Sequence, residues 1–245
     1  MYVDAHVHMT DTSFDKDRDI ILENIKNIVI MESGLNYENN LDVMKLSREY
    51  DCVKPCIGFH PEFVVNSTVE DADRIIEYIY ENKEEIVGLS EIGLDYKFGF
   101  KEKQHVIFKK FLTLAEEIRL PVIVHSRWAA GAVIRVMKNF DLSVDLHAFS
   151  GTIEEAKKAV DLGYFLSFGP NLVFNKFRQQ MLETIPLENI LTETDSPVLG
   201  PKHGERNIPN NITLAIKKIS EIKDLTVNDS EKEVYRNSKK IFKFL

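Results

Sequence analysis

The chain begins with a strand-like run that carries its most informative residues, Asp4-Ala5-His6-Val7-His8. His6 and His8 are two positions apart, so on a β-strand both imidazoles face the same side, roughly 6–7 Å apart. Two neutral imidazoles that converge on one point suit a divalent metal better than they suit a hydrophobic core. A short pair of this kind also arises by chance, so the positions of further ligands must decide between a metal site and packing.

Length and composition are those of one large domain. A chain of 245 residues that is 44% hydrophobic and 29% charged has ample material for a core, and this length is usual for one α/β barrel. No apolar run reaches the roughly 18–20 residues of a membrane span, and Asp4 and His6 interrupt the N-terminal run. We therefore expect a cytoplasmic protein without a signal peptide, membrane contact or obligate protein partner.

The net charge narrows the possible partners. The formal net charge is −8 and the isoelectric point is near 5.5, whereas a protein that coats a duplex through many phosphate contacts is usually basic. The end of one DNA strand or a small phosphodiester, held in a metal-containing cleft, remains compatible with this charge. The two cysteines, Cys52 and Cys56, have no second pair, which argues against a disulfide scaffold and against a four-cysteine zinc site.

Strand-like and helical patterns alternate along the whole chain. The strand-like runs are short and β-branched, and they stop at Gly, Pro, Ser or charged residues, as buried parallel strands do. We predict a (β/α)8 TIM barrel over residues 1–245 as a single domain, with an extra C-terminal helix. A doubly wound sheet is the rival fold, but its glycine-rich phosphate-binding motifs are missing. The expected strands are Tyr2–Met9, Ile28–Met31, Val53–Phe59, Ile86–Ile92, Pro121–His125, Ser143–Leu146, Tyr164–Phe168 and Asn189–Thr192, and expected helices include Lys101–Arg119, Thr152–Leu162, Asn211–Ile222 and Asp229–Phe244.

Residues that can bind a metal fall at the ends of these strands. In a parallel barrel, catalytic side chains collect at the carboxyl ends of the strands. Five of the seven histidines lie at strand ends, whereas His105 lies on a predicted helix and His203 in the loop after the eighth strand. Histidines that pack in a core normally occur singly, so this distribution predicts a metal centre. The strand-end residues are His6, His8, His60, Glu91, His125, His147 and Asp195.

The donor types and their number favour two ions. Nitrogen and oxygen donors without thiolate suit divalent ions such as zinc, manganese or magnesium. The six candidate ligands exceed what one tetrahedral ion takes; they are His6, His8, Glu91, His125, His147 and Asp195. Glu91 is central in strand order and has two oxygens, so it is the natural bridge. We expect His6, His8 and Asp195 to complete one site, and His125 and His147 the other. Glu193 either orients a ligand from behind, which we favour, or forms an ion pair in the barrel.

Seven ordered motifs resemble those of one family. They extend from about residue 2 to residue 210, and together they are far more specific than any one of them. The chain resembles the TatD family of metal-dependent deoxyribonucleases, in the amidohydrolase superfamily of barrels. The motifs are Asp4-Ala5-His6-Val7-His8, Gly58-Phe59-His60-Pro61, Glu91-Ile92-Gly93-Leu94-Asp95, Pro121-Val122-Ile123-Val124-His125-Ser126-Arg127, His147-Ala148-Phe149-Ser150-Gly151, Glu193-Thr194-Asp195-Ser196-Pro197 and Arg206-Asn207-Ile208-Pro209.

The resemblance implies hydrolysis of DNA phosphodiesters, as a 3′-to-5′ exonuclease on single strands. It implies two divalent ions, between which a water loses its proton near neutral pH and attacks phosphorus. Glu91 and Asp195 then belong to the catalytic centre, with Asp195 as ligand and proton acceptor. The resemblance also implies that His60 contacts the scissile phosphate. His203 and Arg206 are further candidates to neutralise charge on the phosphoryl oxygens.

The sequence departs from the family pattern at three positions. Trp128 follows His125-Ser126-Arg127, where the family usually has an acidic residue, and it either stacks on a base or packs in the loop. Ser90 and Glu205 stand where glycine and a basic residue are common. The first rival function is a hydrolase of amides, esters or lactones, such as a deacylase, because the ligands alone do not select the bond. A non-catalytic protein with a structural metal is the second, although structural zinc sites are closed by four ligands.

Overall fold

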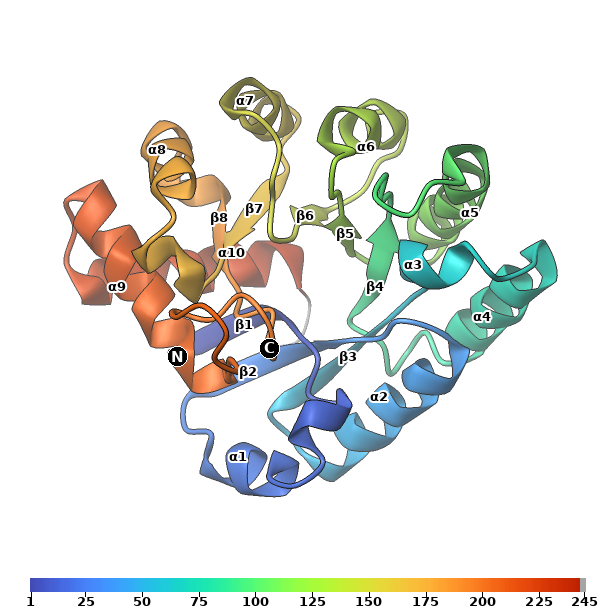
Figure 1. Cartoon of the computed structure of the whole chain (residues 1–245), viewed down its shortest axis with the longest axis horizontal. Helices are drawn as coiled ribbons and strands as arrows, with labels where there is room; N and C mark the ends of the chain where they lie inside the picture. Colours follow the sequence, from blue (N-terminus) through green and yellow to red (C-terminus); the bar gives the residue numbers. More distant parts are fainter. Residues whose placement is uncertain (243–245) are drawn as a thin grey trace.

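Eight short strands form one parallel sheet in chain order, β1 to β8, as the computed structural model of residues 1–242 shows (Figure 1). Every strand lies beside its sequence neighbours and is connected to the next through helices on the outside of the sheet. The predicted (β/α)8 barrel is confirmed, and all eight predicted strands are present. The strands are β1 (Tyr2–Val7), β2 (Ile28–Ser33), β3 (Val53–Ile57), β4 (Gly88–Gly93), β5 (Val122–His125), β6 (Val144–Leu146), β7 (Phe165–Phe168) and β8 (Ile190–Thr192).

The helices agree with the predicted periodicities to within about two residues. Thr152 is the N-cap of α7, and its side chain and that of Glu155 form the predicted capping box. The last helix begins at Val227, two residues before its predicted start, because Thr226 accepts a hydrogen bond from the amide of Asp229. The helices are α1 (Arg18–Asn24), α2 (Tyr37–Glu49), α3 (Pro61–Val64), α4 (Val69–Glu81), α5 (Lys101–Ile118), α6 (Ala130–Met137), α7 (Ile153–Asp161), α8 (Lys176–Thr184), α9 (Ile212–Lys223) and α10 (Val227–Ile241).

Two strands end earlier than their apolar patterns predict, where the chain turns toward the site. Met9 leaves the ladder because its amide donates to the carboxylate of Glu32 at 2.8 Å. Beyond β3, the amide of His60 donates to the carbonyl of Leu35 instead of to a neighbouring strand. The predicted end of the last helix, residues 243 and 244, lies outside the described residues. Within residues 1–242, no helix combines the length and the apolar character needed to cross a membrane.

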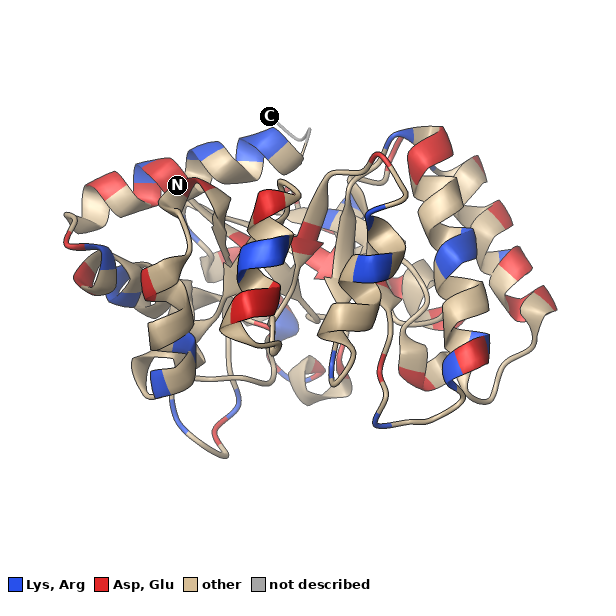
Figure 2. Ribbon diagram, turned by 90° about the horizontal axis from the view of Figure 1, so that it is seen from above, with Lys and Arg blue, Asp and Glu red and all other residues tan. Residues whose placement is uncertain are grey.

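The barrel has apolar side chains on both sides of its sheet. Outside, Leu89, Val122 and Leu166 pack with helix residues such as Phe108 and Phe111 in the main core. Inside, Val3, Ala5 and Ile123 form a second cluster with Ile241 at the end of α10, so the last helix covers one end of the barrel. Cys56 lies in that inner cluster, and Cys52 and Cys56 are free cysteines. Acidic and basic positions are interspersed along the outer helices (Figure 2).

Side chains close the seam between the last strand and the first. Thr192 Oγ1 donates to the carbonyl of Val3 at 3.0 Å, and the amide of Thr194 donates to Asp4 Oδ1 at 2.7 Å. Asp4 is fully buried, and burial raises the pKa of its carboxyl well above the usual range. Just beyond, the amide of Asp195 donates to the carbonyl of His6 at 2.9 Å. The seam therefore brings two of the predicted ligands together from opposite ends of the chain.

Candidate metal centre

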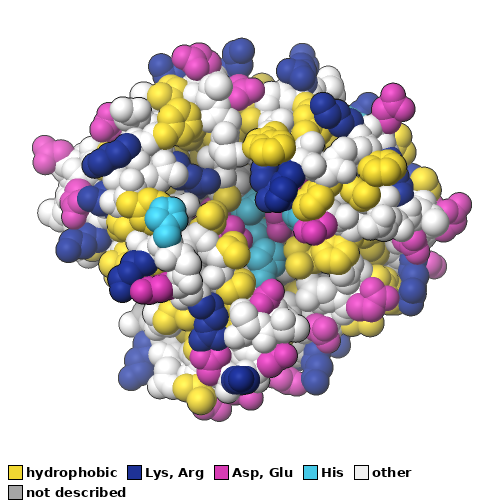
Figure 3. All heavy atoms as spheres, viewed as in Figure 1, with side chains coloured by type: hydrophobic (Ala, Val, Ile, Leu, Met, Phe, Trp, Pro, Cys, Tyr) yellow, Lys and Arg dark blue, Asp and Glu magenta, His cyan; other side chains and the backbone are white. Residues whose placement is uncertain are grey.

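The predicted ligands line a hollow at the carboxyl ends of the strands. Figure 3 shows histidine side chains at the bottom of this hollow, with hydrophobic and charged side chains around its rim. Its volume is about 350 Å³, and we refer to it as the central cavity. His6 lies behind the wall and is fully buried. The predicted residues that line the cavity are His8, His60, Glu91, His125, His147 and Asp195.

Glu91, on β4, lies between two groups of histidines. Its Oε2 is 3.4 Å from Nε2 of both His6 and His8. Its Oε1 is 2.6 Å from His125 Nδ1 and 2.9 Å from His147 Nε2. The two oxygens of one carboxylate thus face different ligand groups, which is the arrangement predicted for a bridging residue.

The first group comes from the β1–β8 seam. The Nε2 atoms of His6 and His8 are 3.0 Å apart, and they lie 3.8 and 3.7 Å from Asp195 Oδ1. His8 Nδ1 is 2.9 Å from the carbonyl of Ser33, which only accepts hydrogen bonds, so Nδ1 carries the proton. His6 Nδ1 is 3.0 Å from the Ser33 hydroxyl. Ser33 on β2 therefore orients both imidazoles with Nε2 toward the site.

The second group comes from β5 and β6, and carboxylates stand behind it. His125 Nε2 donates to Asp95 Oδ2 at 2.9 Å, which leaves Nδ1 to face Glu91. His147 Nδ1 is 3.6 Å from Glu193 Oε2, beyond hydrogen-bond distance but within ion-pair distance. Glu193 also accepts from the amide of Ala148 and from Ser167, both at 2.8 Å. Glu193 thus stands behind His147, where a residue that orients this ligand would lie.

His60 differs from the other histidines in its hydrogen bonding. It is the N-cap of α3, where its Nδ1 accepts from the amide of Glu62 at 3.2 Å. In the neutral imidazole the proton must then be on Nε2, which lies 3.4 Å from Glu91 Oε1. His60 therefore directs an N–H donor into the central cavity and uses its other nitrogen to cap α3, whereas the outer nitrogens of the ligand histidines face Ser33, Asp95 or Glu193.

Burial and mutual charge shift the titration of the site. Burial lowers the pKa of His6 to about 3 and raises that of Asp195 to about 6. Burial also opposes the charged forms of His8 and Glu91, but the opposite charges around them prevail. The pKa of His8 is raised to about 9, and that of Glu91 is held well below its usual range. Protons on the histidines thus offset the acidic charge of the site.

The donor set fits divalent metal ions. Four groups of three side chains have donor atoms within 4.8 Å of one another, and two of them, His6–His8–Glu91 and Glu91–His125–His147, share Glu91. The other two are His6–His147–Asp195 and His60–Asp95–His125. The Nε2 atoms of His6 and His8 lie 3.0 Å apart and their Nδ1 atoms are bonded from behind, so both Nε2 atoms face a common position. A cation at that position would replace the proton that the His8 imidazole carries in the metal-free site.

Three other predicted substrate contacts lie in different surroundings. Trp128 is 72% exposed, beside a cavity that adjoins the centre. His203 packs its ring against Phe174, with the ring centroids 4.4 Å apart. Arg206 is paired with Asp17, its Nη1 2.8 Å from Asp17 Oδ1. The structure therefore brings neither His203 nor Arg206 to the central cavity, because the loop after β8 carries them to its outer side.

Several residues of the centre had no assigned role in the sequence. Asp95 and Ser33 bond the ligand histidines from behind, and Glu32 holds the turn after β1 through Met9 and Thr10. Arg178 on α8 is 8% exposed and donates to the carbonyl of Ala148 at 2.5 Å. Of these residues, only Asp95 has a signal in the sequence. The motif Glu91-Ile92-Gly93-Leu94-Asp95 places this second acidic residue four positions after Glu91.

Comparison with known sequences agrees with this arrangement. A family described as TatD related DNase matches residues 3–243. An uncharacterized metal-dependent hydrolase of Methanocaldococcus jannaschii is 35% identical over 248 residues, which cover 99% of this chain and 97% of that protein. Human deoxyribonuclease TATDN3 is 33% identical over 257 residues, covering 98% of this chain and 94% of its own.

Comparison with solved structures shows the same fold. The crystal structure of YjjV, a TatD homologue from Escherichia coli K12, matches with a TM-score of 0.91. The match covers 99% of this chain and 98% of YjjV at 24% sequence identity. The family match covers residues 3–243, and the side chains that can bind a metal are clustered as described above. The chain therefore belongs to the TatD family of metal-dependent hydrolases.

Proposed function

We propose that this hydrolase cleaves phosphodiester bonds of DNA, as a 3′-to-5′ exonuclease on single strands, with two divalent ions bridged by Glu91. The deoxyribonuclease name of the human relative supports the substrate class. The observation that carries the proposal is the orientation of His60, which directs an N–H donor into the cavity beside the ligands. A phosphoryl oxygen is an acceptor that such a donor binds well.

Different residues of the centre would bind the metal ions, accept a proton and bind the phosphate. His6, His8 and Asp195 would hold one ion and His125 and His147 the other, with Glu91 shared, and the bound ions would supply a nucleophile at neutral pH and screen the phosphate charge. A carboxylate oxygen of Asp195 that faces the site is placed to accept a proton from the attacking water. His60 Nε2 donates to a phosphoryl oxygen as negative charge grows on it.

One assay tests the reaction class directly. The full chain is incubated with Mg²⁺, Mn²⁺ or Zn²⁺ and offered end-labelled single-stranded oligonucleotides, bis(4-nitrophenyl) phosphate and aminoacyl esters. We expect stepwise release of mononucleotides from the 3′ end. Hydrolysis of the esters with none of the phosphodiesters would overturn the proposal and favour the deacylase alternative.

His60→Ala tests the role of the donor. We expect turnover to fall roughly a hundredfold, as for the loss of one donor to a developing oxyanion, while elemental analysis finds the metal content of the unaltered protein. His105→Ala is the matched control, because His105 on α5 bonds Tyr96 outside the cavity. Loss of metal in His60→Ala would instead make His60 a ligand.

A further inference from the structure

The central cavity continues into two more cavities along the rim of the barrel. The next one, which we call the linking cavity, has a volume of about 510 Å³ and shares His125, His147 and Asp195 with the central cavity. The third, the outer cavity, has a volume of about 440 Å³ and shares Trp128 and Ser150 with the linking cavity. Shared walls make the three cavities one groove that leads from Glu91 to α6 and α7.

Trp128 stands where the linking and outer cavities meet, in a conformation that packing does not explain. It is 72% exposed, and its φ of 58° lies in the left-handed region. A non-glycine residue there costs about 1–2 kcal/mol, and exposure of a large aromatic ring forgoes its hydrophobic stabilisation. This exposure argues against the packing alternative for Trp128, whose indole borders the groove.

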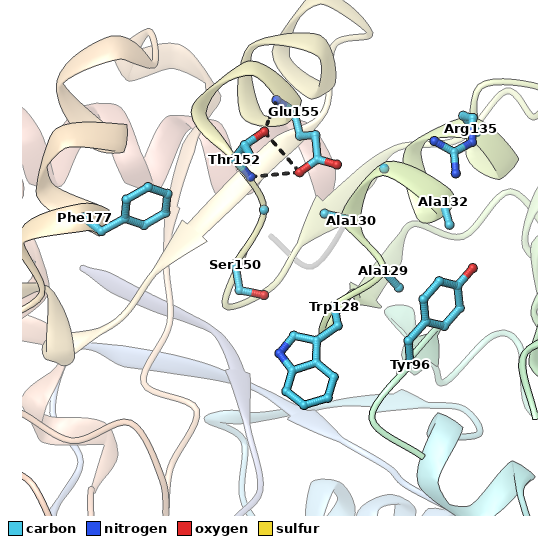
Figure 4. A pocket seen from close by; sticks show the side chains of 12 residues that line it. Tyr96, Trp128, Ala129, Ala130, Ala132, Arg135, Ser150, Thr152, Glu155 and Phe177 are labelled. Carbon is cyan, nitrogen blue, oxygen red and sulfur yellow. Dashed lines mark hydrogen bonds between the residues drawn. The ribbon is translucent and has the colours of Figure 1, made fainter. Parts of the chain in front are cut away.

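A second exposed ring lies across the outer cavity. Phe177 on α8 is 47% exposed, and Figure 4 shows it and Trp128 on either side of Ser150. The small side chains of Ala129 and Ala130 line the space beyond Trp128. Two rings that border an open space with a small-residue wall leave room for a flat aromatic group. Every nucleobase offers such a face, and stacking tolerates any base.

Arginine side chains line the groove on the path to those rings. Arg127 and Arg178 line the linking cavity, and Arg135 lines the outer cavity. Arg178 is more than nine-tenths buried, and its Nη1 has no hydrogen-bond partner within residues 1–242. A buried guanidinium with an unmet donor favours an anion beside it. Arg127 is paired with Asp95, its Nη2 2.6 Å from Asp95 Oδ2, and Asp195 and Glu155 also line the groove. The buried, unmet donor of Arg178 is therefore the feature that favours a phosphate there.

We infer that the groove is a binding site for the nucleotide next to the scissile phosphate. Its phosphate lies by Arg178 in the linking cavity, and its base stacks on Trp128 and Phe177 in the outer cavity. This inference rests on the proposed phosphodiesterase activity and extends it, because it makes the substrate a strand that continues beyond the cleaved bond. A small diester would fill the central cavity alone.

The test is an abasic scan on the full chain with Mn²⁺. Thymidine pentanucleotides carry one abasic nucleotide at each of the three positions nearest the cleaved end, and bis(4-nitrophenyl) phosphate is the reference substrate. We expect the ratio of kcat/KM for oligonucleotide to kcat/KM for the reference to fall roughly tenfold at one abasic position. In Trp128→Ala and in Phe177→Ala the ratio for the intact oligonucleotide falls, mainly through KM, to that of the abasic one, so the abasic penalty disappears. Trp128→Phe keeps the penalty.

The chain offers matched controls for both rings. Phe100 is 64% exposed with a φ of 48°, and Tyr80 is 47% exposed; neither lines the groove. Phe100→Ala and Tyr80→Ala should keep the full abasic penalty. A flat scan in the unaltered enzyme, or an unchanged penalty in Trp128→Ala, overturns the inference while leaving phosphodiesterase activity in place. Absence of hydrolysis of every phosphodiester overturns the proposed function as well.

Discussion

The two halves of the metal centre differ in what stands behind the histidines. Behind His6 and His8 there are neutral groups, the hydroxyl and the carbonyl of Ser33. Behind His125 and His147 there are carboxylates, those of Asp95 and Glu193. A carboxylate on the far nitrogen makes an imidazole a stronger donor to a cation. We therefore expect the second half to bind its ion more tightly than the first.

The pKa values of the histidines differ between the two halves in the same way, except at His8. Burial lowers the pKa of His6 to about 3, whereas carboxylates outweigh burial at His147 and raise its pKa well above the usual range. His8 is the exception in the first half, since Glu91 and Asp195 raise its pKa to about 9. The acidic charge thus decides which histidines hold a proton, and a metal ion must displace those protons.

Removal of Glu91, which both halves share, should weaken metal binding in both halves and so abolish the difference between them. Glu91→Ala deprives both halves of an oxygen, so we expect loss of most bound metal and a fall in hydrolysis of more than roughly a hundredfold. Elemental analysis and a diester assay measure the two effects. Full activity of metal-depleted Glu91→Ala protein would contradict a shared ligand.

Metal binding should weaken as the pH falls. His8 is protonated below its pKa of about 9, and a metal ion needs the Nε2 lone pair, so binding releases a proton and affinity rises with pH. For at least one proton released, affinity at pH 8 should exceed that at pH 6 by roughly a hundredfold. Titration calorimetry in buffers of different ionisation enthalpy counts the protons. Binding without proton release would show that His8 is neutral in the metal-free protein.

Asp95→Asn should weaken the second half alone. Asparagine keeps an acceptor for His125 but removes the negative charge, and such changes behind a ligand lower metal affinity roughly 10- to 100-fold. Competition with a fluorescent chelator measures both binding steps. The weakened step should be the tighter of the two. If only the weaker step changes, the order of affinities assigned to the two halves is reversed.

Ser33→Ala should have the smallest effect. The substitution removes the hydroxyl beside His6 and leaves the carbonyl that orients His8. We expect the affinity of the first half to fall less than roughly tenfold, since a neutral hydrogen bond is worth about 1 kcal/mol. The same chelator titration measures it. An effect as large as that of Asp95→Asn would mean that charge behind the ligands does not set the affinity.

The sequence located the candidate ligands better than the groups around them. His6, His8, Glu91 and His125 lie at strand ends, where barrel geometry fixes the direction of a side chain. Arg206 lies in a long loop, where no repeat fixes direction, and Asp17 pairs with it instead. Ser33 and Arg178 come from elements far away in sequence, and their roles depend on how β2 and α8 pack. Apolar patterns located all eight strands, but they do not record the bonds to Glu32 that end β1 early.

The seam between β8 and β1 also bears on how the fold is completed. His6 and Asp195 face the same site although almost the whole barrel separates them along the chain. An ion held by both would act as a cross-link that closes a very long loop, and the entropy of that closure would be lost by the unfolded chain. The seam has side-chain bonds from Thr192 and Thr194 at this point. Metal binding would thus contribute to the cohesion of the barrel where its first and last strands meet, in addition to its part in the reaction.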